Sequence, residues 1–297
     1  MIAGSGLFRP SDQHRDALVA TARVLGERHA AGVANHDRDA TIHCALIDDL
    51  CAEGYHAAPI DRRYGGGSHR LVDIIFAQAA LAEFDPATAL GIGMHLMVVG
   101  TESWLSNWPE WRRRDVFDRV ARKNAILNVF ATEPAIGSPL GDARPQTILR
   151  PTGANSWALE GAKSFSTFAP IVSDAIVYCT VDDGSGDVAR VLVRTDHPSI
   201  AVEHTWNPIG MRATASHTIH FAGTPVATSE VIARFPFNRR ASRPAMTPWF
   251  ALPVAAVYLG IARAARDEAV SAARRPFTPS PRTARRRGTG GPPPARE

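Results

Sequence analysis

Apolar residues follow a helical period through roughly the first 120 residues. Between residues 71 and 82 they recur every three or four positions, at Leu71, Ile74, Ile75, Ala79 and Ala82. Such a stripe faces a core in a packed helix. The run from Cys51 to Gly54 fits the end of an earlier helix, with Gly54 in the left-handed conformation. Asp85-Pro86 fits the cap and the first position of a further helix. We therefore predict an N-terminal helical domain over residues 1 to 127.

From about residue 128 the apolar pattern changes to short alternating or β-branched runs, separated by turn signals. The clearest runs are residues 156–159, 175–181, 188–193 and 217–221. Acidic and glycine residues between 182 and 186 mark a turn between two of them. Many short strands joined by short connections are typical of a small barrel. We predict a central antiparallel β-barrel over residues 128 to 235.

Helical composition returns at Met246 and stops near Arg275-Pro276, because proline breaks a continuing helix. Residues 236 to 275 are therefore predicted to begin a C-terminal helical bundle that stays incomplete. We expect its apolar face, at Val257, Leu259 and Ile261, to be partly uncovered. Residues 276 to 297 contain mainly Arg, Pro and Gly and are predicted to be a disordered basic tail. The predicted fold class is α+β and multidomain.

The net charge of +4 and the isoelectric point near 9.3 come from this tail. From Arg274 onward there are seven Arg and one Glu, and subtracting their +6 from +4 leaves the body at −2. The body is therefore not expected to bind nucleic acid.

The uncharged apolar stretch from Trp249 to Ala262 is shorter than the ~20 residues needed to cross a bilayer, so we expect no membrane partner. The N-terminus lacks signal-peptide features and the three cysteines form no close pair. These observations predict a cytoplasmic protein.

Three short motifs occur in order in the β-rich part. They are Thr132-Glu133-Pro134-Ala135-Ile136-Gly137-Ser138, Leu159-Glu160-Gly161-Ala162-Lys163 and Gly210-Met211-Arg212. With the helices before them and after them, this order resembles the acyl-CoA dehydrogenase family of flavoproteins, over about residues 40 to 275. The resemblance implies an FAD-dependent oxidoreductase of fatty acid metabolism that dehydrogenates an acyl-CoA thioester at a CH–CH group. The incomplete bundle implies that its activity is impaired.

The resemblance also implies roles for individual residues. Backbone groups from Phe130 through Ala131 to Thr132, and the Thr132 hydroxyl, would bind the flavin ring. Phe165 would stack on the ring and Thr167 would lie near its N5 atom. Ser138 would lie beside the flavin phosphates or the substrate pyrophosphate. Taken singly, the same threonines are ordinary strand hydroxyls and Phe165 is an ordinary core residue.

Three residues depart from the family pattern: Pro139, Phe168 and Ala227. Pro139 is expected to alter the end of the flavin pocket that binds the phosphates. Arg212 is expected on a barrel strand, either near the flavin, holding a loop, or in a structural ion pair.

The catalytic base is unknown from the sequence. The resemblance implies a glutamate base at one of two places. Alignment on Gly260 puts Phe250 at the first place, and no Asp or Glu occurs from Val231 to Arg266. The second place is in the last part of the bundle, beyond the helix expected to end near Arg275. Asp267 and Glu268 fit a solvated helix face. A flavin-dependent monooxygenase of the same fold, which needs no such base, is therefore an alternative, as is a non-catalytic relative. The implied partners are an electron-accepting flavoprotein or a flavin reductase, and a second copy of the chain.

The histidines predict no metal site. His217 and His220 lie three apart, which places them on opposite faces of a strand. His29, His36 and His43 recur every seven residues, but Gly32 and the run 35–37 are expected to interrupt any helix joining them. Tyr64-Gly65-Gly66-Gly67 lacks the neighbours of a phosphate-binding loop and is expected to be a tight turn.

Overall fold

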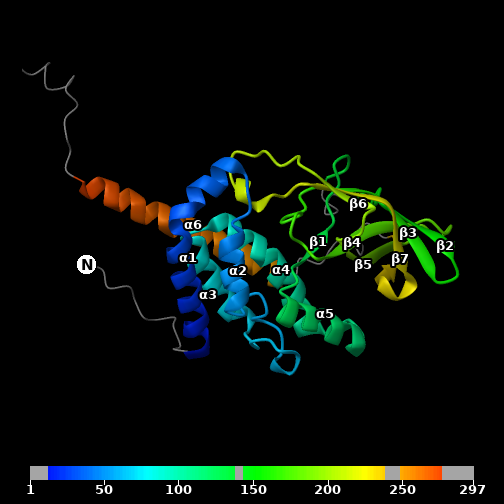
Figure 1. The fold of residues 1–297 in the computed structure, drawn as a ribbon, viewed down its shortest axis with the longest axis horizontal. Helices are drawn as coiled ribbons and strands as arrows, with labels where there is room; N and C mark the ends of the chain where they lie inside the picture. The colour runs from blue at the N-terminus through cyan, green and yellow to red at the C-terminus, as the bar shows by residue number, and fades with distance from the viewer. Residues whose placement is uncertain (1–12, 138–142, 238–247, 276–297) are drawn as a thin grey trace, which may run out of the picture.

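The computed structural model describes residues 13–137, 143–237 and 248–275. Five helices come first and a sixth comes last, and Figure 1 shows them gathered on one side of the molecule, with the sheet on the other. Their bounds are α1 Gln13–Asp39, α2 Cys44–Ala52, α3 Leu71–Ala82, α4 Pro86–Leu105, α5 Glu110–Lys123 and α6 Pro248–Arg274.

The sheet lies between α5 and α6 in the chain. Its strands are β1 Leu127–Phe130, β2 Ile148–Gly153, β3 Ser156–Lys163, β4 Asp174–Val181, β5 Val188–Arg194, β6 Ile200–Glu203, β7 Thr218–Ala227 and β8 Val231–Phe235. The predicted order of helices, sheet and helix is confirmed. The predicted tail falls on residues 276–297, which lie outside the described residues, and the exact domain boundaries stay predictions.

The sheet differs from the predicted antiparallel barrel in two respects. Its strand order is β6-β7-β3-β2-β4-β5-β8 with β1 beside β4, and this path does not close among the described residues. It is also mixed, because β1 and β2 both run parallel to β4. Alternation within a strand shows that one face is buried, but it does not show which strands become neighbours. The sequence pattern therefore could not exclude parallel pairs.

Local signals at the helix ends act as predicted. The Asp85 side chain accepts a hydrogen bond from the Thr88 N–H at 2.9 Å and caps α4, with Pro86 at its first position. Gly54 follows α2 with a φ of +70°, a conformation that glycine adopts without strain. A Cβ on Gly66 would lie 2.2 Å from the Ile60 carbonyl oxygen, so the glycine run is a tight turn.

The prediction for α1 was wrong. This helix runs without a break from Gln13 to Asp39, through Gly32 and residues 35–37. A single helical glycine costs only ~1 kcal/mol relative to alanine, which tertiary packing easily offsets. Packing of α1 against α3 and α2 supplies that support. His29 and His36 consequently lie on one continuous helix.

Helix α6 packs closely on α3 and α4. A Cβ on Gly260 would lie 2.4 Å from the Ala79 carbonyl oxygen, so only glycine lets the two backbones approach this closely. The apolar face of α6 is partly uncovered, as predicted: Leu259 is 48% exposed, and Leu252 and Tyr258 are exposed to similar extents. Within that face, Val257 is fully buried and Ile261 is partly buried against the core.

By length and composition alone, α6 is the one described helix that could cross a membrane. It is longer than the uncharged stretch that ends at Ala262, because it continues through Arg263. Core helices of soluble proteins pass the same test. Helix α6 packs against α3 and α4, and 28% of its apolar window is buried.

A second hydrophobic core joins the helices to the outer face of the sheet. Val116, Phe117 and Val120 of α5 pack with Leu127 of β1 and Ile176 of β4. The buried His95 of α4 connects the same two layers. Its Nδ1 accepts the Leu127 N–H at 2.9 Å and its Nε2 donates to the His56 carbonyl oxygen at 2.9 Å. The strand that leads into the Thr132 loop is thereby fixed to the helical layer.

Candidate functional site

The end of β1 and the end of β3 meet at a cleft of about 460 Å³. The Ser164 N–H donates to the Thr132 carbonyl oxygen at 2.9 Å, which places the two predicted motifs side by side. Thr132 and Phe165 both line this cleft. The structure therefore brings together residues that lie more than thirty positions apart in the sequence.

Phe165 is an exposed aromatic residue held in an uncommon backbone conformation. Its φ is +53° and its side chain is 64% exposed. Non-glycine residues with positive φ are uncommon and concentrate where the surrounding structure determines them. Trp206 meets the Phe165 ring edge to face, with ring centroids 5.2 Å apart. The pair forms an apolar wall that a planar aromatic group can cover.

Trp206 is itself fixed in place. Its indole N–H donates to the Met211 carbonyl oxygen at 3.0 Å, and its backbone N–H donates to Nδ1 of His217 at 3.1 Å. Sequence reasoning did not find this residue, nor the hydroxyls of Thr205, Ser216 and Thr218 that complete the cleft. The only available signal was the position of Trp206 just before the Gly210-Met211-Arg212 motif.

A buried ion pair lies next to the cleft and fixes the loop that lines it. Lys163 and Glu133 are 0% and 2% exposed, and the Lys163 Nζ lies 2.6 Å from Glu133 Oε1. Glu133 also accepts the backbone N–H groups of Gln146 and Thr147, at 2.7 and 2.9 Å. Burial opposes its ionisation, but Lys163 and the two backbone N–H groups together lower the Glu133 pKa. These two motif residues fix the loop and neutralise each other's charge.

The remaining predicted flavin residues lie around this cleft rather than in its lining. Phe130 is 1% exposed in the core, so only its backbone could serve a ligand. The Ala131 carbonyl oxygen lies 3.5 Å from Lys163 Nζ. The Thr167 hydroxyl lies 3.0 Å from that of Ser216, which does line the cleft. Their proposed roles stay predictions.

Ser138 and Pro139 lie outside the described residues. Phe250, at the aligned base position, is half-buried on α6. Phe168, another departure from the family pattern, is buried, and its ring occupies the place where a side chain on Gly91 would lie.

Arg212 was predicted to lie on a barrel strand. It lies instead in a short 3₁₀ turn, Arg212–Thr214. Its Nε donates to the Asp37 carbonyl oxygen at 2.9 Å and its Nη1 donates to Asn207 Oδ1 at 2.8 Å. Figure 1 shows this part of the chain reaching from the sheet to the end of α1. Arg212 therefore holds a loop, which was one of the roles expected for it.

His217 and His220 have separate surroundings, in agreement with their assignment to opposite faces. His217 is buried, whereas His220 is exposed and pairs with Glu203 at 2.8 Å. His36 and His43 stack with centroids 4.2 Å apart, and His43 Nδ1 lies 3.0 Å from the buried Asp85 carboxylate. Among the described residues, one group has ligand-type atoms within 4.8 Å of one another, in His14, His69 and Asp73. Asp73 already forms an ion pair with Arg70.

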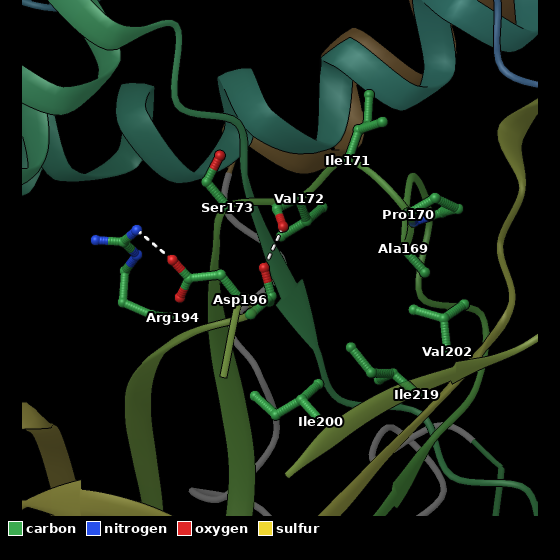
Figure 2. A pocket seen from close by; sticks show the side chains of 11 residues that line it. Ala169, Pro170, Ile171, Val172, Ser173, Arg194, Asp196, Ile200, Val202 and Ile219 are labelled. Atoms are coloured by element: carbon green, nitrogen blue, oxygen red, sulfur yellow. Dashed lines mark hydrogen bonds and ion pairs between the residues drawn. The ribbon is translucent and has the colours of Figure 1, made fainter. Parts of the chain in front are cut away.

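A separate hollow of about 340 Å³ lies at the seam between β6, β7 and the segment 169–173. Figure 2 shows Ile200, Val202 and Ile219 facing this segment. Arg194 at its rim is already paired with Asp196 at 2.7 Å. This hollow contains none of the predicted flavin residues.

Comparison with known proteins agrees with this architecture. The family model for the acyl-CoA dehydrogenase N-terminal domain matches residues 11–121, and the model for the middle domain matches residues 128–224. The acyl-CoA dehydrogenase homologue YdbM of Bacillus subtilis (strain 168) is 32% identical over 268 residues, or 89% of this chain and 67% of YdbM.

The amino sugar nitrososynthase RubN8 of Streptomyces rubradiris is 31% identical over 269 residues, which are 86% of this chain and 62% of RubN8. The chain therefore spans less than two thirds of that relative. A solved structure of KijD3 with FMN and a dTDP-amino-keto sugar superposes with a TM-score of 0.79 at 27% identity, over 95% of this chain and 70% of KijD3. With both domain models matched in order on the observed helical and sheet layers, this chain belongs to the acyl-CoA dehydrogenase family.

Proposed function

We propose that this chain is part of a flavin-dependent oxidoreductase in which the cleft between Thr132, Phe165 and Trp206 holds the flavin ring. We propose further that the reaction is of the monooxygenase type. This choice rests on the chemistry of the cleft. Its described lining contains one carboxylate, and that carboxylate is not available as a base. Glu133 is buried and bound to Lys163 and to two backbone N–H groups.

The residues of the cleft fit a flavin ring. Phe165 offers an exposed aromatic face, and Trp206 holds that face in position. Thr132 and Ser216 provide neutral polar groups at the rim, which suit the uncharged polar edge of an isoalloxazine. When bound, the flavin supplies the two-electron redox chemistry. The residues of this chain orient the ring, cover one face and keep the adjoining charges paired.

Base catalysis separates the two branches of this family. Removal of an α-proton from an acyl thioester needs a carboxylate within reach of that proton. Phe250 occupies the aligned early position, and the described part of α6 carries its first carboxylate at Asp267, whose side chain is 66% exposed. Oxygen-dependent chemistry on reduced flavin does not need this base. The identity to RubN8 supports the same branch.

Acyl-CoA dehydrogenation is the second candidate, favoured by the identity to YdbM. It would require FAD, an acyl-CoA thioester and an electron-accepting flavoprotein. The monooxygenase candidate would instead require reduced FMN or FAD from a partner reductase and a different small-molecule substrate. In both cases we propose a cytoplasmic enzyme that associates with further copies of itself.

Parallel assays of the purified protein distinguish the candidates. In one, a flavin reductase with NADH supplies reduced FMN or FAD, and oxygen uptake and product formation are measured with dTDP-amino sugars. In the other, reduction of ferricenium is measured with butyryl-CoA. Sugar oxidation without ferricenium reduction is expected. Ferricenium reduction at rates typical of dehydrogenases would instead establish the second candidate, and inactivity in both assays with flavin bound would exclude both.

A further inference from the structure

A third hollow, a half-open cavity of about 220 Å³, lies between the two layers, away from the flavin cleft. One wall is the C-terminal half of α4 with the loop after it, and the other is the outer face of β1, β4, β5 and β8. Half of its lining residues are aliphatic or Met, and two more are aromatic; the aliphatic or Met residues are Met97, Val98, Leu105, Val129, Ile176 and Ile232. It is smaller than the ~300–1,000 Å³ of sites for drug-sized ligands.

Arg190 of β5 places a positive charge in this mainly apolar lining. Its guanidinium carbon lies 4.8 Å from the centroid of the Tyr178 ring and 5.5 Å from that of Phe235. Tyr178 is its direct cross-strand neighbour on β4. The guanidinium is therefore held over two aromatic rings, which limits the conformations open to a long side chain.

Among the described residues, no carboxylate pairs with this guanidinium. Its Nε is buried and has no hydrogen-bond partner. Other arginines of the same sheet and of α5 are paired, Arg194 with Asp196 at 2.7 Å and Arg119 with Asp174 at 2.9 Å. Arg190 is half-buried as a residue, and a buried N–H donor without an acceptor is unfavourable. The cavity thus offers an unused donor on a positively charged group.

Glu102, on the opposite wall, does not supply an acceptor for this donor. Its two oxygens accept the backbone N–H groups of Trp108 and Asn107, at 2.8 and 3.2 Å. The carboxylate is thereby directed into the loop that follows α4. Burial raises the Glu102 pKa, against the hydrogen bonds of Trp108 and Asn107.

We propose that this cavity binds a small monocarboxylate with an apolar body, and that Arg190 binds the carboxylate. A guanidinium presents two parallel N–H groups that match the two oxygens of a carboxylate. One guanidinium balances one negative charge, which favours a monoanion. The aliphatic lining removes the remainder of the ligand from water. This site does not depend on the flavin.

Phenylacetate and its neutral analogue phenylacetamide provide the test, by isothermal titration calorimetry with and without saturating FMN. We expect phenylacetate to bind at least tenfold more tightly than phenylacetamide, with the same affinity whether or not FMN is present. Arg190→Gln should abolish the preference. Arg194→Gln, which changes a paired arginine of the same strand, should leave it intact.

A second variant tests the same cavity without changing Arg190, so the proposal can still be tested if Arg190→Gln does not fold. Met97→Trp enlarges a side chain in the cavity wall and should abolish binding of both probes while Arg190 is unchanged. Circular dichroism checks that each variant is folded. Equal affinity for the two probes, no binding of either, a preference that survives Arg190→Gln, or competition by FMN would each overturn the proposal.

Discussion

At the scale of single residues, the family motifs divide into two kinds. Glu133 and Lys163 are buried and pair with each other, so their part is to hold a loop. Thr132 and Phe165 line the cleft, so their part is to meet a ligand. The sequence placed both kinds in the same short motifs. Only their burial in the structure distinguishes the residues that hold the loop from those that meet a ligand.

We expect Thr132→Val combined with Thr167→Val to weaken flavin binding and leave the fold intact. Each lost hydrogen bond is worth about 0.5–1.5 kcal/mol, so the dissociation constant should rise by roughly 5- to 150-fold. Flavin fluorescence titration measures it. Thr152→Val, at an exposed position of β2, is the matched control. Unchanged affinity in the double variant would refute the assignment of these threonines.

Loss of Lys163 should destabilise the whole protein. Lys163→Met leaves the Glu133 carboxylate buried without its counter-charge, which costs about 3–5 kcal/mol. Urea denaturation followed by circular dichroism measures the free energy of unfolding. Lys123→Met, at the exposed end of α5, changes the only other lysine and should have little effect. Similar losses from both substitutions would contradict a structural role for the pair.

At the scale of elements, the packing of α6 depends on a close approach to α3. The backbones meet at Gly260, where a Cβ would lie 2.4 Å from the Ala79 carbonyl oxygen and 2.7 Å from the Ala82 Cβ. The α4 surface is shaped in the same way, since Gly100 leaves room for the Trp249 ring. Small residues on α3 and α4 therefore decide where the last described helix docks.

Gly260→Ala should lower stability although alanine is the better helix former. The clash with a backbone oxygen cannot be relieved by a rotamer change, so we expect a loss of about 1–3 kcal/mol. Thermal unfolding by calorimetry measures the change. Leu259→Ala, at the neighbouring exposed position of α6, should be nearly neutral. A melting temperature that rises in Gly260→Ala would show that the two helices separate easily.

At the scale of the whole molecule, His95 joins the helical layer to the sheet. Its Nδ1 accepts the Leu127 N–H, so its Nε2 carries the proton that is donated to the His56 carbonyl oxygen. Complete burial, with a smaller contribution from His56, lowers the His95 pKa to about 3. The contact between the two layers thus requires a neutral imidazole.

Stability should therefore fall as the pH falls from about 6.5 towards about 3. In this range the unfolded chain binds a proton at residue 95 and the folded chain does not, which costs about 1.4 kcal/mol per pH unit. His95→Gln should reduce the slope of unfolding free energy against pH by that amount between pH ~6 and ~4. His220→Gln, at an exposed position, is the control. An unchanged slope in His95→Gln would rule out a buried neutral histidine.

The candidate site was partly predictable for a physical reason. Thr132 and Phe165 belong to short motifs whose local conformation is encoded by neighbouring residues, so they could be named from the sequence. Trp206 lies on a connection between β6 and β7, and its edge-to-face contact with Phe165 exists only once those strands pair. The position of Arg212 at the end of α1 likewise joins residues 175 positions apart.

The sequence by itself determined the order of helical and β segments, the caps at Asp85 and Gly54, and the end of α6 near Arg275, because periodicity and capping act over a few residues. Only the tertiary structure decided the parallel pairing of β1 and β2 with β4, the unbroken course of α1, and the burial of Val257. These features depend on which surfaces meet across long chain separations. Packing there outweighs local preferences of about 1 kcal/mol, which are all that a single glycine contributes.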